Sequence, residues 1–322
     1  MRRRQCLSAA LALAAGGSAG PAHALMAGEL PDSPAARVDA NTTASPWSGA
    51  VSVVAGGSAF SGVMIGPQHV LTAAHVAAGQ AASALRVVIN LGATPLSMTV
   101  ATSTTYPGTV FPYDDLCVLR LVQPAPAGAA IYPIADTPVA TGAQLTMVGY
   151  GASGNGSATP TANASSSVKR RGGNVIDQLP DRLDASGRSS PFWICDFDGP
   201  AGTGPMGGAS LGNTIETCMA SGDSGSPVFI DTGNGPALYG LSTLVLNFGN
   251  GAASSTFGSG GGGPVLAHAP YLAWLQAQTD GSVMLLSQLS AADVPVAPAW
   301  ALGLLGAALL SPLLRRPERT RG

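Results

Sequence analysis

The sequence predicts an all-β fold, either a sandwich or a barrel, and three observations support this. Short runs rich in β-branched and apolar residues recur between residues 50 and 246, separated by Gly, Pro, Ser and Asn. This spacing is typical of sandwiches and barrels rather than of βαβ units. The chain is 46% hydrophobic, which is too apolar for a disordered protein, and its 43 glycines and 25 prolines do not suit a helical bundle.

The expected elements follow in chain order. Strands are predicted over 50–56, 60–66, 86–92, 115–122, 144–151, 226–230 and 237–246. One short helix is predicted over 269–279, because Tyr271, Leu272 and Leu275 have helical spacing behind a proline. Two segments rich in Gly, Ser and Asn, 151–173 and 248–264, have no apolar periodicity, so we expect both to be surface loops.

The two ends of the chain differ in composition from its middle. Residues 1–24 combine three arginines, an apolar run and a small-x-small site that ends at Ala24, which is the layout of a secretory signal peptide. The alternative is a buried N-terminal helix. Residues 294–322 join an uncharged run to four arginines, which predicts a membrane helix with a cytoplasmic basic end. We therefore expect an exported protein whose mature chain begins at Leu25.

The C-terminal tail resembles the PEP-CTERM sorting signals of Gram-negative bacteria, with Val294-Pro295 in place of the usual Pro-Glu-Pro. The resemblance implies a sorting enzyme as a partner that removes the tail. It also implies a location in the periplasm, on the cell surface or outside the cell, with anchoring by the C-terminal helix before processing. A simple tail anchor is the alternative. Between the two ends we expect one domain over 25–282 and a linker over 283–293.

Charge and metal-ligand spacing exclude several classes of function. Residues 25–298 carry 8 Lys and Arg against 16 Asp and Glu, so their net charge is −8. A basic face for nucleic acid is therefore not expected. The chain has no Cys/His cluster with the spacing of metal ligands and no phosphate-binding Gly-rich loop. We accordingly expect no metal, nucleotide or other cofactor.

Three cysteines follow the expected signal peptide. Because three is an odd number, one disulfide and one free thiol are predicted for an exported chain. We expect Cys195 and Cys218 to pair, since they flank the loop before Ser224, and Cys117 to be buried in its apolar strand.

A candidate nucleophile stands in the Gly-Asp-Ser-Gly run at 222–225, in a chain with only 10% charged residues. A nucleophilic hydroxyl at neutral pH needs a base within hydrogen-bond reach and a third group that orients the base. His75 in "VLTAAHV" and Asp115 in "YDDLCVLRL" are the candidates for these two roles. Asp114 is the rival for the orienting role.

The motifs "LTAAH", "DDLCVLRL" and "GDSGSP" resemble the three signatures of the chymotrypsin/trypsin family of serine endopeptidases, in its bacterial secreted branch. The resemblance covers 25–281 and implies two six-stranded antiparallel barrels with the active site between them. It also implies that Ser224 is the nucleophile, His75 the base and Asp115 the orienting carboxylate. The N–H groups of Gly222 and Ser224 would form the oxyanion hole. Substrates would be proteins or peptides, and the enzyme would be a monomer.

In this family the residue before the nucleophile pairs with the free α-amino group of the mature chain. The resemblance therefore implies that Asp223 meets the terminus at Leu25, exposed by signal cleavage. The alternative is that local backbone groups or another cation satisfy Asp223.

The resemblance also implies where the specificity pocket lies. Its base is Cys218 rather than an acidic residue, so a basic side chain is not the expected substrate group. Val245 stands where the family has glycine and should narrow the pocket, which favours a small or medium apolar side chain. The full set of expected pocket residues is Cys218, Met219, Ala220, Ser221, Thr243, Leu244, Val245 and Gly263.

Two rival functions remain open. A binding protein with the same fold would usually lack one of the three catalytic residues, and this chain retains all three. An esterase would commonly hold its serine in Gly-x-Ser-x-Gly with the histidine last in the chain. The run "GDSGS" fits that motif loosely, but here the histidine precedes the serine.

Overall fold

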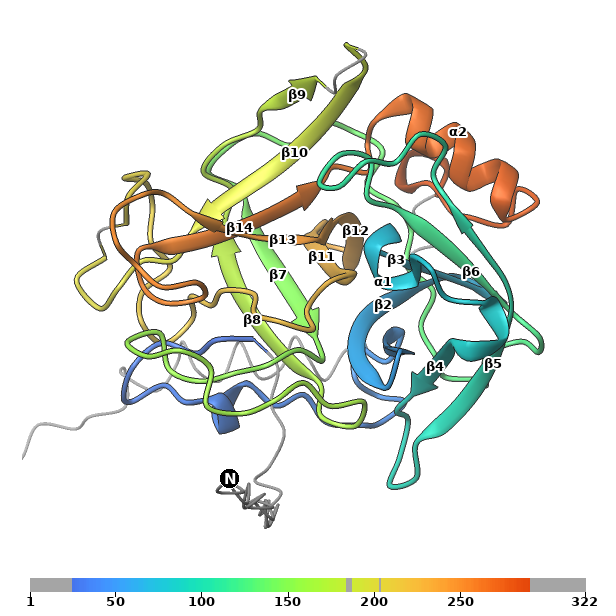
Figure 1. Ribbon diagram of the computed structural model, residues 1–322, viewed down its shortest axis with the longest axis horizontal. Helices are drawn as coiled ribbons and strands as arrows, with labels where there is room; N and C mark the ends of the chain where they lie inside the picture. Colours follow the sequence, from blue (N-terminus) through green and yellow to red (C-terminus); the bar gives the residue numbers. More distant parts are fainter. Residues whose placement is uncertain (1–24, 184–186, 203, 290–322) are drawn as a thin grey trace, which may run out of the picture.

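Six antiparallel strands of the first half close into a barrel in the order β1-β2-β3-β6-β5-β4 (Figure 1). The computed structural model describes residues 25–183, 187–202 and 204–289. The barrel strands are β1 (Ala50–Ala55), β2 (Ser58–Gly66), β3 (His69–Thr72), β4 (Arg86–Ile89), β5 (Leu96–Thr105) and β6 (Cys117–Leu121). The first of the two barrels implied by the resemblance is therefore present.

Alternate residues of the barrel strands serve two different cores. Val51, Val53 and Met64 belong to the cluster inside the barrel. Val63 and Ile65, their neighbours on the opposite face, pack in a second cluster with residues of the other half. Because successive side chains of a strand point to opposite faces, a strand buried on both sides is an almost continuous apolar run. This explains why runs such as 60–66 carry few polar residues.

The second half consists of two four-stranded antiparallel sheets, in the orders β12-β11-β7-β8 and β13-β14-β10-β9. The two sheets are joined by isolated bridges, Gly240 to Val265 and Gln178 to Ile194, and by further backbone hydrogen bonds of the segments beside the strands. The described strands form two sheets, so the closed second barrel that the resemblance implies is not clearly shown. The strands are β7 (Gln144–Gly149), β8 (Arg170–Val175), β9 (Asp181–Leu183), β10 (Ser189–Asp196), β11 (Ser226–Asp231), β12 (Pro236–Ser242), β13 (Leu244–Asn247) and β14 (Ser259–Pro264).

The expected surface loops over 151–173 and 248–264 both contain buried strand residues, which corrects the prediction. Strand β14 occupies the glycine run at 259–264, and every residue of it is buried. A Cβ at Gly263 would overlap the carbonyl oxygen of Leu241, so glycine is what lets the strands approach. Strand β8 begins at Arg170, which is fully buried together with Lys169.

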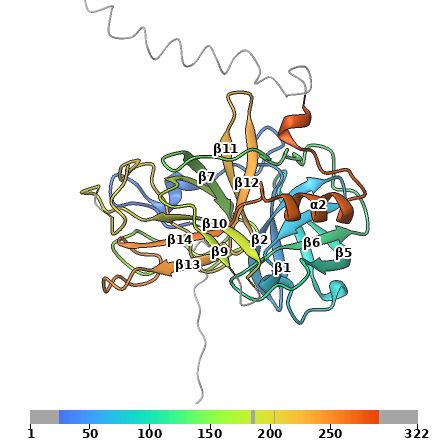
Figure 2. The ribbon, with the colours of Figure 1, turned by 90° about the horizontal axis from the view of Figure 1, so that it is seen from above.

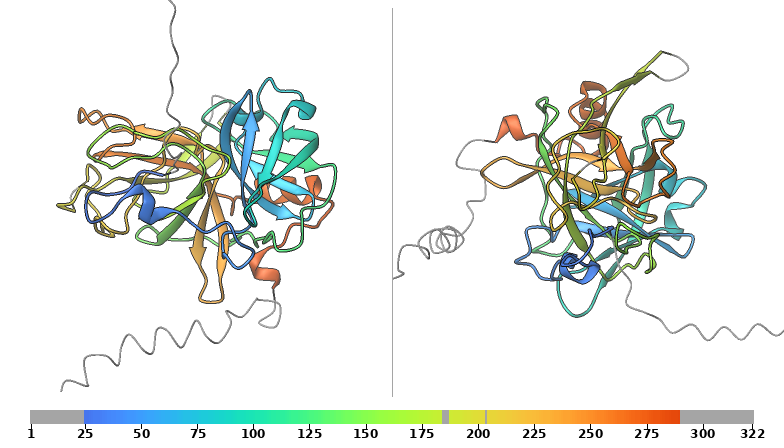
Figure 3. Two further views of the ribbon diagram at one scale, coloured as in Figure 1. Left: turned by 90° about the horizontal axis from the view of Figure 1, so that it is seen from below. Right: turned by 90° about the vertical axis from the view of Figure 1, so that its left-hand side faces the viewer.

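Helix α2 (Ala269–Gln278) is confirmed, and it lies against the first half (Figures 1 and 2). The two halves lie side by side in Figure 1 and in the left view of Figure 3. The remaining helices are short, namely η1 (Pro34–Arg37), α1 (Ala74–Ala77), η2 (Ala82–Ala84) and η3 (Leu286–Gln288).

Packed structure continues past the predicted domain end at residue 282. Val283 and Leu285 are buried in the same cluster as α2. Ile134 exchanges backbone hydrogen bonds with this segment, donating to Met284 and accepting from Leu286. The linker expected over 283–293 is therefore part of the domain up to residue 289.

The predicted disulfide between Cys195 and Cys218 is absent. Both thiols are free and fully buried in the apolar cluster of the second half, where cysteine acts as a small apolar side chain. Burial raises the pKa of the Cys218 thiol to about 12. Cys117 is free and buried in the first barrel, as predicted.

The predictions for the two ends of the chain concern residues that the structure does not describe. The signal peptide over 1–24 and the membrane segment over 294–322 lie outside the described residues. Within the described ranges, no helix has the length and apolar character needed to cross a bilayer.

Candidate active site

Strand pairing in the first barrel brings His75 and Asp115 together. Thr72 at the end of β3 pairs with Cys117 at the start of β6. His75 follows the first of these residues on α1, and Asp115 precedes the second, so both lie at the same end of the barrel. The Asp115 carboxylate accepts two hydrogen bonds from His75, one from the backbone N–H at 2.9 Å and one from Nδ1 at 2.6 Å. A fully buried carboxylate thus fixes both the backbone and the ring of His75.

Ser224 reaches the histidine from the second half, just before β11. Its Oγ lies 2.8 Å from Nε2 of His75. Its carbonyl oxygen accepts a hydrogen bond of 3.0 Å from the Ser61 N–H on β2. Gly225 has φ +81°, and a Cβ there would overlap the Ser61 carbonyl and the Thr72 hydroxyl. Glycine at this position is therefore what lets the two halves meet at the nucleophile.

Asp114, the rival for the orienting role, points away from His75. Its carboxylate accepts a hydrogen bond of 2.6 Å from the Tyr271 hydroxyl on α2 and forms an ion pair with Arg188. It has φ +53°, a conformation that side-chain-bearing residues adopt infrequently. Of the two neighbouring aspartates, Asp115 is the one that contacts the histidine.

The predicted oxyanion-hole residues, Gly222 and Ser224, lie in a tight turn before β11. Gly222 has φ +91°, and a Cβ there would lie 2.6 Å from that of Ala164 and 2.9 Å from the Ala59 carbonyl. The Ser61 hydroxyl donates to the Gly222 carbonyl at 3.1 Å and so orients the peptide. Within the described part of the chain, the N–H groups of Gly222 and Ser224 donate no hydrogen bond. Both therefore have the capacity to bind a carbonyl oxygen.

Asp223 is buried directly behind the nucleophile. Its carboxylate accepts hydrogen bonds of 2.9 Å from the N–H groups of both Gly151 and Ala220. A third, of 3.3 Å, comes from the backbone nitrogen of Leu25. Burial raises the pKa of this carboxyl to about 7. Backbone N–H groups, including that of Leu25, thus hold the carboxylate, and its pairing with a free α-amino group at Leu25 stays a prediction.

The start of the described chain is held inside the second half. Leu25 and Met26 are fully buried. The Met26 N–H donates to the Cys218 carbonyl at 2.8 Å, and the Ser153 hydroxyl bonds the Leu25 carbonyl. In the full-length sequence the Leu25 nitrogen belongs to a peptide bond, and cleavage after Ala24 would convert it into an ammonium group beside Asp223.

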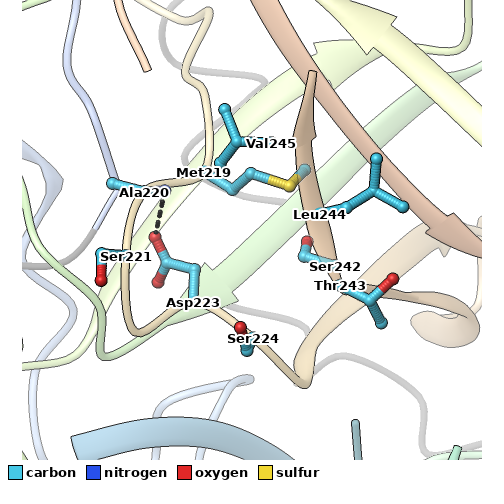
Figure 4. A pocket seen from close by; sticks show the side chains of 9 residues that line it. All are labelled: Met219, Ala220, Ser221, Asp223, Ser224, Ser242, Thr243, Leu244 and Val245. Carbon is cyan, nitrogen blue, oxygen red and sulfur yellow. Dashed lines mark hydrogen bonds between the residues drawn. The ribbon is translucent and has the colours of Figure 1, made fainter. Parts of the chain in front are cut away.

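A small pocket of about 70 Å³ opens beside Ser224 (Figure 4). The Met219 side chain lines the pocket and packs against β14, since a Cβ on Gly261 would overlap the sulfur and methyl group of Met219. Two expected members do not line the pocket. Cys218 is buried beneath it, and Gly263 is packed against Leu241. The lining residues are Met219, Ala220, Ser221, Asp223, Ser224, Ser242, Thr243, Leu244 and Val245.

The sequence did not indicate that Phe111 belongs to the site. Its ring meets the ring of His75 edge-on, with centroids 5.3 Å apart, and the side chain is 55% exposed. Phe111 lies in the loop before Asp115, and this loop has no regular apolar pattern that would have pointed to the residue. The available signal was an aromatic residue close before the candidate aspartate.

Comparisons with known proteins agree with this geometry. The sequence profile of the trypsin-like peptidase domain matches residues 60–238. Among solved structures, the chain is similar to neuropsin, a serine protease expressed in the limbic system of mouse brain. That match has a TM-score of 0.54 and 16% identity, and covers 75% of this chain and 97% of neuropsin. At this identity the likeness shows the fold alone. No curated protein sequence matches the chain.

Proposed function

Because the chain belongs to the trypsin-like peptidase family, we propose that it is a serine endopeptidase that cleaves peptide bonds through an acyl-enzyme intermediate. The observation that carries this proposal is the continuous relay from Asp115 through His75 to Ser224, with hydrogen bonds of 2.6 and 2.8 Å. The relay joins two halves of the fold and ends at the pocket beside Ser224.

Each group has a role that its position supports. Ser224 Oγ attacks the scissile carbonyl while Nε2 of His75 takes the hydroxyl proton. Asp115 stabilises the imidazolium that forms, and the N–H groups of Gly222 and Ser224 stabilise the oxyanion. His75 then protonates the leaving amine, and water, activated by the same base, releases the acyl group. The absence of one oxyanion donor typically costs about 3 kcal/mol of transition-state stabilisation.

The pocket supports a preference for small apolar side chains before the scissile bond. A cavity of about 70 Å³ is less than half of the roughly 150 Å³ that accepts a benzene ring in a protein core. Asp223, its acidic lining residue, is 1% exposed and held by backbone donors, so it does not offer a free charge to a basic substrate group. Alanine is the substrate side chain that this geometry suits best.

Activation is proposed to follow from removal of the signal peptide alone. The buried Leu25 nitrogen already lies 3.3 Å from the Asp223 carboxylate, so cleavage after Ala24 would place an ammonium group against it without moving the chain. N-terminal sequencing of the active protein should then give Leu-Met-Ala-Gly. An active form that begins well beyond Leu25 would contradict this proposal.

The proposal includes an exported monomer of a Gram-negative bacterium, with a C-terminal tail that is sorted or anchored at the membrane. It rests on the composition of 1–24 and 294–322. Cell fractionation with antibodies to the catalytic domain and to the tail tests the location and the removal of the tail. Recovery of the whole chain in the cytoplasm would contradict it.

Peptide and ester substrates distinguish an endopeptidase from an esterase and from a binding protein. The protein, expressed from the full-length gene and purified as its host processes it, is incubated with internally quenched peptides and with p-nitrophenyl acetate. An endopeptidase cleaves the peptides with alanine before the scissile bond, and Ser224→Ala abolishes that cleavage. Ester hydrolysis without peptide cleavage would favour an esterase. Neither activity in a folded sample would favour a binding protein.

A further inference from the structure

An arginine of the second half holds a loop of the first barrel. Arg188 stands directly before β10, and its side chain reaches the loop over 106–116, which connects β5 to β6. Its Nη1 donates to the Pro107 carbonyl at 3.0 Å, and its Nη2 donates to the Gly108 carbonyl at 2.9 Å. The same Nη2 pairs with the carboxylate of Asp114. One guanidinium therefore contacts both the first and the last part of the loop.

The start of the loop is shaped around this guanidinium. Gly108 has φ +78°, and a Cβ there would lie 2.7 Å from Nη1 of Arg188. The central carbon of the guanidinium lies over the Tyr106 ring, 5.8 Å from its centroid. Tyr106 is buried and packs edge-on against Tyr271 and Trp274 of α2. A glycine, an aromatic face and two carbonyls thus fit the planar fork of an arginine, which a lysine ammonium does not reproduce.

Two hydroxyl groups hold the base of the loop together with the arginine. The Thr109 hydroxyl lies 2.7 Å from the Tyr106 carbonyl oxygen and 2.8 Å from that of Asp114, so it bridges the two ends of the loop. On β10, the Ser190 hydroxyl accepts a hydrogen bond of 3.2 Å from the Asp114 N–H. The base of the loop is therefore closed on itself and attached to the start of β10.

The tip of the loop faces the catalytic residues. Val110 and Phe111 are 66% and 55% exposed, although both are apolar. The Phe111 ring meets the His75 ring edge-on. Because the base that takes the Ser224 proton must lie beside the scissile bond, an exposed ring against His75 borders the substrate. The position of the loop tip therefore affects how a peptide fits next to the nucleophile.

We propose that Arg188 is a positioning residue for peptide substrates and acts through the loop that carries Phe111. This role rests on the proposed function, because it concerns the binding of an endopeptidase substrate. Without the guanidinium, the base of the loop would lose its contacts with the second half, and Phe111 would leave its place against His75 in part of the molecules. Peptides would then bind more weakly, while the hydrogen bonds between His75 and Ser224 would remain.

The test compares variants of the host-processed protein. Arg188→Met should raise KM for an internally quenched peptide about tenfold and change kcat less than about threefold, because it removes a group that places the substrate rather than one that reacts. Arg188→Lys should keep most of the wild-type Tm, since its ammonium still faces Asp114, but it should not restore KM. Arg171→Met, which alters an exposed arginine on β8, should match the wild type in KM and kcat.

Two further measurements separate positioning from a general loss of stability. Hydrogen exchange followed by mass spectrometry should show faster exchange in Arg188→Met that is confined to residues 106–116. Phe111→Ala should raise KM by a factor similar to that of Arg188→Met. In the Phe111→Ala background, Arg188→Met should add little, because both substitutions remove the same contact with the substrate.

The proposal would be overturned by an unchanged KM in Arg188→Met, or by independent effects of Arg188→Met and Phe111→Ala on KM. Full recovery of KM in Arg188→Lys would show that charge alone suffices, and it would also overturn the role of the planar fork. A wild type that cleaves no peptide would contradict the proposed function instead. Hydrogen exchange needs no substrate, so unchanged exchange over 106–116 in Arg188→Met would still show that the arginine does not hold the loop.

Discussion

At the scale of single residues, the adjacent aspartates 114 and 115 have opposite surroundings. Asp115 holds His75 through two hydrogen bonds, whereas Asp114 binds Tyr271 and Arg188. Of these two neighbouring aspartates, one therefore holds the candidate base His75 and the other anchors α2 through Tyr271.

This difference gives a matched pair of variants. Asp115→Asn should lower kcat by about 10⁴, because the imidazole would lose the carboxylate that fixes its tautomer and stabilises its charge. Asp114→Asn should lower Tm through the loss of its ion pair with Arg188, while kcat of the folded fraction changes less than tenfold. Steady-state kinetics and thermal unfolding separate the two effects. A larger loss of kcat in Asp114→Asn would reverse the assignment.

We expect the Met219 side chain to limit the size of the pocket. Met219→Gly should remove the closure at the inner end and raise kcat/KM for a phenylalanine substrate relative to an alanine substrate by at least tenfold, since each methylene accommodated is worth about 1 to 3 kcal/mol. Val245→Gly, which widens the side wall, is the comparison. Hydrolysis of a matched peptide pair measures the ratio. An unchanged ratio in Met219→Gly would show that another group closes the pocket.

His75, Asp115 and Ser224 could be identified from the sequence because each stands in a local motif, and the pocket could be predicted only in part. The family resemblance placed Cys218, Met219 and Gly263 in the pocket, but of these three only Met219 lines it. The odd cysteine count could not show that all three thiols lie in apolar clusters.

At the scale of elements, the loop predicted from composition was wrong where a run of glycines forms a strand. The run at 259–264 lacks side chains and so has no apolar pattern, yet β14 is the buried centre of its sheet, paired to β10 and β13. In the first barrel, β1, β2, β4 and β6 were easier to predict because both of their faces are largely apolar, whereas the mostly exposed β5 carries no such run. The second half is not clearly a closed barrel, since its two sheets are joined through bridges outside the regular strands, which the sequence pattern does not reveal.

The end of the domain offers a test at this scale. A chain cut after Ser282 loses Val283 and Leu285, which are buried against α2, whereas a chain cut after Leu289 keeps them. Burial of two such side chains contributes about 3 to 6 kcal/mol to the free energy of unfolding. The shorter chain should lose this contribution and therefore unfold at a lower urea concentration. Urea titration of the two proteins measures the difference. Equal unfolding midpoints would show that residues 283–289 contribute nothing.

At the scale of the whole molecule, the two halves meet around buried charge. His75 and Asp115 come from the first, Ser224 and Asp223 from the second, and Leu25 lies against Asp223. The state of the Leu25 nitrogen should therefore influence the stability of the entire fold.

The contribution of Asp223 to the free energy of unfolding should depend on pH. With Leu25 in a peptide bond, the pKa of Asp223 is raised to about 7 from an ordinary value near 3.8, so the folded chain holds a proton that the unfolded chain releases. Its free energy of unfolding should then fall by about 3 kcal/mol as pH rises from 4 to 7. A chain that begins at Leu25 carries an ammonium group there and should lose much less.

Urea unfolding at several pH values compares the Leu25 form with one extended by two residues. Parallel profiles for the two forms would contradict the pairing. A steeper loss for the Leu25 form would contradict the sign of the effect.

Activation of Ser224 by His75 and Asp115 is tested most directly by treatment of the purified protein with a fluorophosphonate, followed by intact mass measurement and peptide mapping. We expect one adduct per chain, on Ser224, with none in Ser224→Ala and far slower labelling in His75→Ala. A folded wild-type protein with Leu25 as its first residue that takes up no label would contradict it.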